Sequence, residues 1–197
     1  MKTIVPETIT HAELALLDVR RYEGPVCLVS TPQDLDQARE EILVEKVVGI
    51  DTETQPTFHK GQVHLPTLVQ VAASQTVYLF QLKRMDFTDL LKEMLENQAI
   101  AKTGIGLSHD FTKLKDRFPF EEKNVVDLSA IARNHGMKQT GVRNLAALFL
   151  GFRVFKGQST TNWARAELTQ NQIIYAATDA WVCRELHLCF QERCFLG

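Results

Sequence analysis

Two acids stand at the end of an apolar, β-branched segment, residues 47–53. Such a run is typical of a strand that is buried on both faces. Residues two apart on a strand point to the same side, so we expect Asp51 and Glu53 to project together. Neighbouring carboxylates at the edge of an apolar core repel each other and lose hydration, which favours a bound cation or proton. A solvated surface turn is the alternative that this stretch alone leaves open.

Two further acids occupy unusual positions on predicted helices. Asp110 begins a helix directly after the glycine-bearing turn of residues 104–106. Asp179 lies inside a largely apolar helix, where an unpaired carboxylate would be costly. Tyr175 comes one turn earlier on the same helix face. Taken singly, Asp110 would serve as a helix cap and Tyr175 as a core aromatic residue.

Basic residues gather between Leu128 and Arg165, a stretch that contains no Asp or Glu. Its cations are Arg133, Lys138, Arg143, Arg153, Lys156 and Arg165. The net charge of −2 by itself indicates no nucleic-acid partner. The block can form a positive surface beside an acidic site, and a solvated basic face without a partner is an equal alternative on charge alone.

Length and composition are those of one ordinary globular domain. The chain has 197 residues, of which 45% are hydrophobic and 23% charged. It contains no apolar run of about 18 residues and no secretory signal, so we expect no membrane association. The four cysteines show no C-x-x-C spacing and are expected to be reduced. A cytoplasmic protein is therefore predicted.

The pattern of apolar residues and turns predicts a single α/β domain that positions these acids. Strands are expected over residues 26–29, 47–53, 68–73, 76–80, 100–102 and 124–126. Helices are expected over residues 31–43, 87–95, 108–117, 128–134, 142–149 and 169–190. The tight turn between the third and fourth strands favours an antiparallel meander at the start of a mixed sheet.

Capping patterns define the helix starts. Thr31 precedes Pro32, and Thr169 and Gln172 form a capping box at the last helix. Thr10 and Glu13 form another capping box near the amino terminus. We expect residues 1–25 to form an N-terminal arm and residues 26–197 to form the domain.

The four acids and Tyr175 together resemble the DEDD exonucleases at all three motifs of that family. The motifs are Asp51-Thr52-Glu53, Gly106-Leu107-Ser108-His109-Asp110 and Tyr175-Ala176-Ala177-Thr178-Asp179. The tyrosine four residues before the last Asp is similar to the tyrosine branch. The stretch Thr161-Asn162-Trp163-Ala164 also resembles a loop of ribonuclease D and Werner-type exonuclease domains. The resemblance covers roughly residues 26–190.

This resemblance implies a ribonuclease H-like α/β fold, with a mixed central sheet flanked by helices. It also implies a metal-dependent 3′→5′ exonuclease that releases nucleoside 5′-monophosphates. Oxygen ligands alone favour two Mg²⁺ or Mn²⁺ ions over zinc. By resemblance, Asp51 bridges both ions, Glu53 and Asp179 bind the ion on the nucleophile side, and Asp110 holds the other largely through water. Tyr175 is implied to orient the attacking water.

The implied partner is the single-stranded 3′ end of a nucleic acid, with no obligatory protein partner. DNA is the favoured polymer, because the second motif carries Gly106 as Werner-like relatives do. The chain ends soon after its final helix, so we expect no appended helicase or accessory nucleic-acid-binding domain. The alternatives are RNA 3′-end processing, as in ribonuclease D, and a non-catalytic nucleic-acid-binding module of the same fold.

Several further residues are candidates for substrate contact. The backbone of Thr52 could contact the terminal nucleotide, Phe58 could wedge against a base, and Lys60, His64 and Lys156 could meet phosphates. We expect Trp163 to pack in the core and His109 to be structural. Gln70 is polar within an apolar strand and either steadies the site or bonds to a neighbouring strand.

Overall fold

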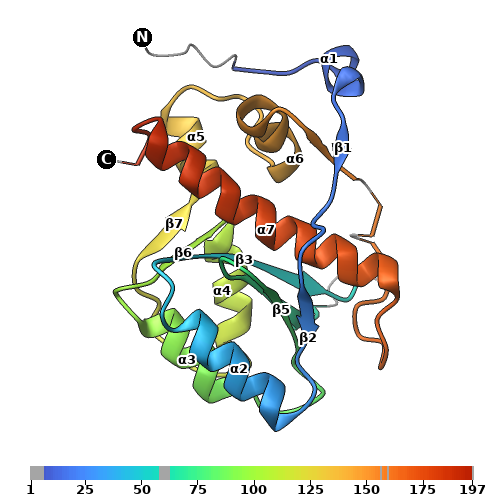
Figure 1. The fold of residues 1–197 in the computed structure, drawn as a ribbon, viewed down its shortest axis with the longest axis vertical. Coiled ribbons are helices and arrows are strands. Elements are labelled where there is room, and N and C mark those ends of the chain that lie inside the picture. The colour runs from blue at the N-terminus through green and yellow to red at the C-terminus, as the bar shows by residue number, and fades with distance from the viewer. Residues whose placement is uncertain (1–6, 58–62, 156, 159, 197) are drawn as a thin grey trace.

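The computed structural model describes residues 7–57, 63–155, 157–158 and 160–196, and its centre is a six-stranded mixed sheet (Figure 1). The strands lie in the order β2-β5-β4-β3-β6-β7. Their bounds are β2 Val26–Leu28, β3 Val47–Thr54, β4 Pro66–Ala72, β5 Val77–Gln81, β6 Ala101–Gly104 and β7 Val125–Asp127. Strands β3, β4 and β5 are antiparallel, whereas β6 runs parallel to β3. The predicted meander within a mixed sheet is therefore confirmed.

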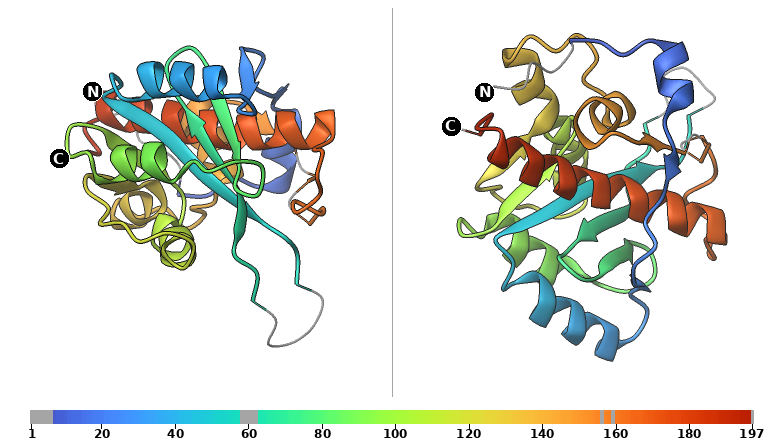
Figure 2. Two further views of the ribbon diagram at one scale, coloured as in Figure 1. Left: turned by 90° about the horizontal axis from the view of Figure 1, so that it is seen from below. Right: turned by 45° about the horizontal axis from the view of Figure 1, so that its top comes forward.

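Helices cover both faces of this sheet (Figures 1 and 2). On one face lie α2 (Pro32–Ile42), α3 (Thr88–Glu96) and α4 (Leu107–Lys115), whose apolar residues share a core with β3, β4 and β5. The long helix α7 (Gln170–Glu192) crosses the other face. Its alanines Ala176, Ala177 and Ala180 pack against Leu68, Ala72 and Leu79 of the sheet. The acids on β3 therefore lie between the sheet and a single helix.

Small residues allow α7 to approach β3 closely. A Cβ atom on Gly49 would lie only 2.0 Å from the carbonyl oxygen of Ala180 and 2.8 Å from the backbone nitrogen of Arg184. Any larger residue at position 49 would push the helix away from the strand. The predicted capping box at Thr169 is present and fixes the start of the helix. Asp179 is thereby held against the strand that carries Asp51.

The segment predicted as one helix over residues 142–149 is divided in the structure. A short α-helix, α6 (Val142–Leu145), continues into a π-helical turn, η1 (Ala146–Leu150), which ends at Gly151 with a left-handed φ of 73°. Together with α5 (Leu128–Asn134) these elements pack against the second half of α7, where Val182, Leu186 and Phe190 belong to their shared core. Periodicity alone does not distinguish a π-helical turn from an α-helix, because the two differ by one residue in one turn.

The amino-terminal segment crosses α7 on its way from α1 to β2, as Figure 1 shows. It contains α1 (His11–Leu16), with the predicted capping box, and β1 (Val19–Arg20). Strand β1 pairs in parallel with β8 (Arg153–Val154), and the sequence predicted neither of these two-residue strands. The Tyr22 backbone N–H donates to the Thr178 hydroxyl at 3.0 Å, and the Tyr22 ring lies 5.8 Å from that of Trp181. These contacts fix the segment beside the helix that carries Asp179.

Among the described residues, no helix combines the length and the apolar character needed to cross a lipid bilayer. All four cysteines are free thiols.

Candidate active site

Three carboxylates converge between β3 and α7. Asp51 and Glu53 project from the same face of β3, and Asp179 reaches them from α7. One carboxylate oxygen of each residue lies within 4.8 Å of the others. Glu53 and Asp179 are only 8% and 5% exposed, so water solvates these charges poorly. The structure therefore brings together three of the four predicted acids in a buried cluster.

The fourth predicted acid, Asp110, lies beside this cluster and is tied to it through Thr52. Its Oδ1 atom accepts a hydrogen bond of 3.0 Å from the Thr52 hydroxyl. Asp110 is in the first turn of α4, which begins after Gly106 in the left-handed conformation, with φ 72°. That turn aims the carboxylate back towards β3. Asp110 is thus connected to the cluster through Thr52 and is not one of its three close carboxylates.

Mutual repulsion and burial make this site unfavourable for free carboxylates. Burial raises the pKa of Asp51 well above its usual value, and the charges of Asp179 and Asp110 raise it further. Burial, followed by the charges of Asp51, Asp179 and Asp110, also raises the pKa of Glu53. The Asp179 pKa is raised to about 6 by burial. A metal-free site therefore retains protons that a divalent cation would displace.

The donors around the cluster suit a hard divalent cation. All of the close ligand atoms are carboxylate oxygens, which Mg²⁺ and Mn²⁺ prefer. Among the described residues, no histidine or cysteine joins the group, as a typical zinc site would require. The chemistry of the residues present therefore fits the predicted class of metal.

Tyr175 lies one turn before Asp179 on α7, and the two side chains influence each other's pKa. Burial raises the pKa of the Tyr175 phenol above its usual value, and the charges of Asp179 and Glu53 raise it further. The nearby phenol in turn lowers the pKa of Asp179. Tyr175 therefore stays protonated at neutral pH and acts as a donor.

Arg143 has a place in this site that the sequence did not predict. Its positive charge lowers the pKa of Asp179, which partly offsets the effect of burial. Its buried Nε atom has no hydrogen-bond partner among the described residues. The sequence placed Arg143 only within a basic block, because contact between α6 and α7 depends on the tertiary fold.

The other cations of that block are used in different ways. Lys138 forms an ion pair with Glu7 at 2.7 Å. Arg133 donates to the hydroxyls of Ser129 and Thr140. Arg153 is a residue of β8, and its Nε atom is buried. Of these cations, Lys138 is paired with an acid, whereas the bonds of Arg133 to hydroxyl groups leave its charge in place, so a basic surface beside the site stays a prediction.

The structure describes only some of the predicted substrate-contacting residues. Phe58, Lys60 and Lys156 lie outside the described residues. His64 is half-buried in the segment before β4. The Thr52 backbone N–H donates to Asp51 at 2.9 Å, so it already has a partner within the site. Contact of these residues with substrate stays a prediction.

Three secondary predictions have clear outcomes in the structure. Trp163 is fully buried, and its ring lies 6.1 Å from that of Tyr175, which confirms that it packs in the core. His109 is exposed beside Asp110, whose pKa is raised by burial and lowered in part by the Thr52 hydrogen bond and the charge of His109. Gln70 pairs with Asp51 across β3 and β4 and is completely buried. Neither atom of its amide has a hydrogen-bond partner among the described residues, so neither predicted role of Gln70 is observed.

Solved structures with the same fold are exonuclease domains. The chain superposes on the EXO domain of Nibbler from Aedes aegypti with a TM-score of 0.78, at 21% identity, over 88% of this chain and 90% of that one. It superposes on Escherichia coli RNase D with a TM-score of 0.75, at 21% identity, over 89% of this chain and 47% of that one. The fold is therefore the ribonuclease H-like α/β fold of these domains, as predicted.

Sequence comparison then defines the family. Residues 26–194 match the family model described as 3′-5′ exonuclease. The chain belongs to this 3′-5′ exonuclease family. It is 34% identical to the bifunctional 3′-5′ exonuclease/ATP-dependent helicase WRN of Mus musculus, over 91% of this chain and 13% of that protein. It is 28% identical to the exonuclease mut-7 homolog of Homo sapiens, over 92% of this chain and 24% of that protein. The chain thus spans less than a quarter of each of these two relatives.

Proposed function

We propose that this chain is a metal-dependent 3′→5′ exonuclease that removes nucleoside 5′-monophosphates from the 3′ end of single-stranded nucleic acid, with DNA as its main substrate. The observation that carries the proposal is the convergence of Asp51, Glu53 and Asp179 within 4.8 Å, inside a chain of the 3′-5′ exonuclease family. A module that only binds nucleic acid has no use for buried carboxylates that repel the phosphate backbone.

Asp51, Glu53, Asp110 and Asp179 would hold two Mg²⁺ or Mn²⁺ ions. Asp51, Glu53 and Asp179 would supply the close carboxylate oxygens, and Asp110, beside them, would complete the set. When bound, such a pair stabilises the attacking and leaving oxygens of an in-line displacement at phosphorus. The hydrogen bond from Thr52 orients Asp110 for this task.

The protonated phenol of Tyr175 orients the attacking water by donating a hydrogen bond. Its raised pKa makes removal of a proton from water by a phenolate unfavourable near neutrality. Arg143 holds Asp179 closer to its ionised form, which is the form that binds a cation.

DNA is proposed as the main polymer because the second motif has Gly106, as in Werner-like sequences. RNA is the second candidate, since relatives of the same fold include an RNase D of Trypanosoma brucei that was solved in complex with RNA U12. The protein would need no obligatory protein partner. A cytoplasmic setting is supported by its four free cysteines.

The test is cleavage of 5′-labelled single-stranded and duplex DNA and RNA, in Mn²⁺ and in excess EDTA. The proposal predicts ladders that shorten from the 3′ end in Mn²⁺, faster on DNA than on RNA, and no cleavage in EDTA. Faster cleavage of RNA would support the second candidate. Cleavage that persists in EDTA would refute metal dependence.

A further inference from the structure

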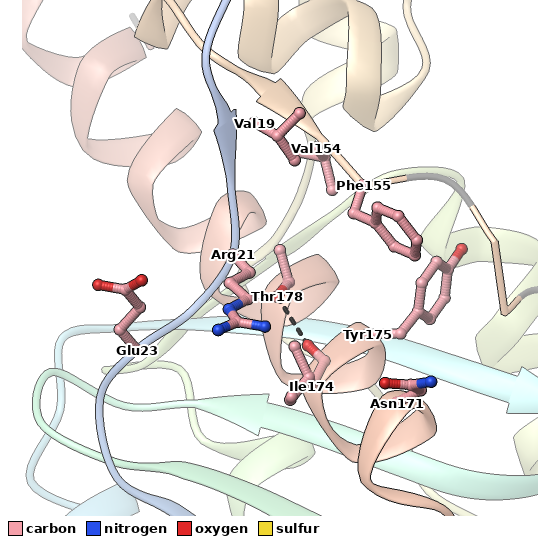
Figure 3. Close-up of a pocket in the computed structure, with 9 residues that line it drawn as sticks. All are labelled: Val19, Arg21, Glu23, Val154, Phe155, Asn171, Ile174, Tyr175 and Thr178. Carbon is pink, nitrogen blue, oxygen red and sulfur yellow. Dashed lines mark hydrogen bonds between the residues drawn. The ribbon is translucent and has the colours of Figure 1, made fainter.

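A cavity of about 340 Å³ lies next to Tyr175, on the side of α7 that faces the amino-terminal segment (Figure 3). Its walls come from three parts of the chain: the segment around β1, the end of β8 with Phe155, and the first turns of α7. Its volume is in the range of about 300–1,000 Å³ that small-molecule sites occupy. None of the four candidate site acids lines it, so it is a separate space that shares Tyr175 with the acid cluster.

One wall of this pocket is aromatic. Phe155 is 57% exposed, which is unusual for so large an apolar side chain. Figure 3 shows its ring beside that of Tyr175, whose pKa is raised by the charge of Asp179. Val19, Val154 and Ile174 add aliphatic surface. A flat ring that enters from solvent would find a stacking partner and apolar surroundings here.

The polar groups of the pocket suit an anionic, hydrogen-bonding ligand. The Arg21 guanidinium points across the pocket towards α7, whereas the Glu23 carboxylate points away (Figure 3). No carboxylate of the described residues forms an ion pair with Arg21. Asn171 presents an exposed amide at the base of the pocket. Thr178 is already engaged, because its hydroxyl donates to the Ile174 carbonyl at 2.6 Å.

We propose that this pocket is a nucleobase subsite, which takes one base within three nucleotides of the 3′ end and stacks it on Phe155. Arg21 meets an adjacent phosphate, and Asn171 meets the edge of the base. The assignment rests on the proposed function, since Tyr175 connects the pocket to the site where the scissile phosphate would lie. A base held here is out of its own stack and cannot pair, so the subsite selects unpaired 3′ ends.

Binding of abasic oligonucleotides tests this subsite. The probe is a 5′-fluorescein single-stranded DNA that carries one abasic nucleotide at the last, the penultimate or the third position from the 3′ end. Affinity is measured by anisotropy in Ca²⁺, where no turnover is needed. For the wild type, one of the three abasic probes should bind about tenfold more weakly than the intact strand, because one stacked base is lost.

Substitution of Phe155 should abolish this difference. Phe155→Ala should bind the intact strand about tenfold more weakly than the wild type and should show no further loss on the abasic probe. Phe155→Leu keeps an apolar side chain without a ring and should behave in the same way, which covers the case in which the alanine variant folds poorly. Val44→Ala removes another exposed apolar side chain, 80% exposed and outside the pocket, and should match the wild type.

Two results would overturn the subsite: equal binding of all three abasic probes by the wild type, or a full abasic penalty in Phe155→Leu. Arg21→Gln should lower the slope of log affinity against log salt by about 0.7, and an unchanged slope would overturn the phosphate contact. Because these measurements need no cleavage, their failure leaves the hydrolytic proposal intact. A protein that selects the base but cleaves nothing would refute only the proposed hydrolysis.

Discussion

Replacement of Asp179 by Asn should make the metal-free protein more stable. Asp179 is 5% exposed, and its pKa is raised from 3.8 to about 6. At about 1.4 kcal/mol per unit of pKa, this corresponds to a penalty on the order of 3 kcal/mol in the free energy of unfolding when the carboxyl is ionised.

The penalty has a defined dependence on pH. Because the folded-state pKa is raised, the penalty is complete above about pH 6 and disappears as the pH falls towards the unfolded value. Urea denaturation in EDTA should therefore show Asp179→Asn to be about 2–3 kcal/mol more stable than the wild type at pH 8, with little difference near pH 4. Saturating Mn²⁺ at pH 8 should stabilise the wild type more than the variant, because the variant has lost a ligand.

Asp36→Asn is the matched control, because Asp36 is exposed on α2 and far from the acid cluster in the fold. This control should change the free energy of unfolding by less than about 0.5 kcal/mol at either pH. If Asp179→Asn were as stable as the wild type, or less stable, in EDTA at pH 8, burial of the ionised Asp179 carboxylate would not cost the folded protein the predicted free energy.

Three further predictions concern catalysis, binding and packing. Tyr175→Phe should lower the turnover number by about 10²–10⁴-fold and leave Mn²⁺ binding unchanged, because only the group proposed to orient water is lost. Calorimetric titration measures Mn²⁺ binding and single-turnover cleavage measures the chemical step. Loss of Mn²⁺ binding would contradict the assignment of Tyr175. Asp51→Asn should retain most of its affinity for single-stranded DNA in Ca²⁺, measured by anisotropy, and a collapse of affinity would place Asp51 in binding as well as in catalysis. Gln70→Leu should raise the free energy of unfolding by about 1 kcal/mol in urea denaturation, because its buried amide has no partner among the described residues, and a loss of stability would show that Gln70 has a partner in solution.

Local patterns made much of the fold predictable. The capping boxes at Thr10 and Thr169 place two helix starts, and both are observed. The apolar run before Asp51 predicts a central strand, and β3 lies between β4 and β6. The ends of elements were less accurate: β4 begins at Pro66, two residues before the predicted start, because pairing with β3 extends through a register shift after Glu53. Neighbouring strands, and not local sequence, decide where such a strand begins.

The acids of the candidate site were predictable because their spacing is a property of the sequence. The role of Arg143 was not, because its effect on Asp179 depends on how α6 packs against α7. The pocket beside Tyr175 depends on the pairing of β1 with β8, which are two residues long and separated by more than a hundred residues. Strands this short carry no alternation of apolar and polar residues that could predict their pairing.

The most direct test of the central claim compares the wild type with Asp51→Asn on the same 5′-labelled single-stranded DNA in Mn²⁺, using protein purified in parallel. The account predicts that the wild type shortens the strand from its 3′ end and releases nucleoside 5′-monophosphates. It predicts that Asp51→Asn, which loses a proposed metal ligand while keeping nearly the same shape, is slower by at least about three orders of magnitude. Equal rates for the two proteins, or a wild type that cleaves neither DNA nor RNA, would contradict the account.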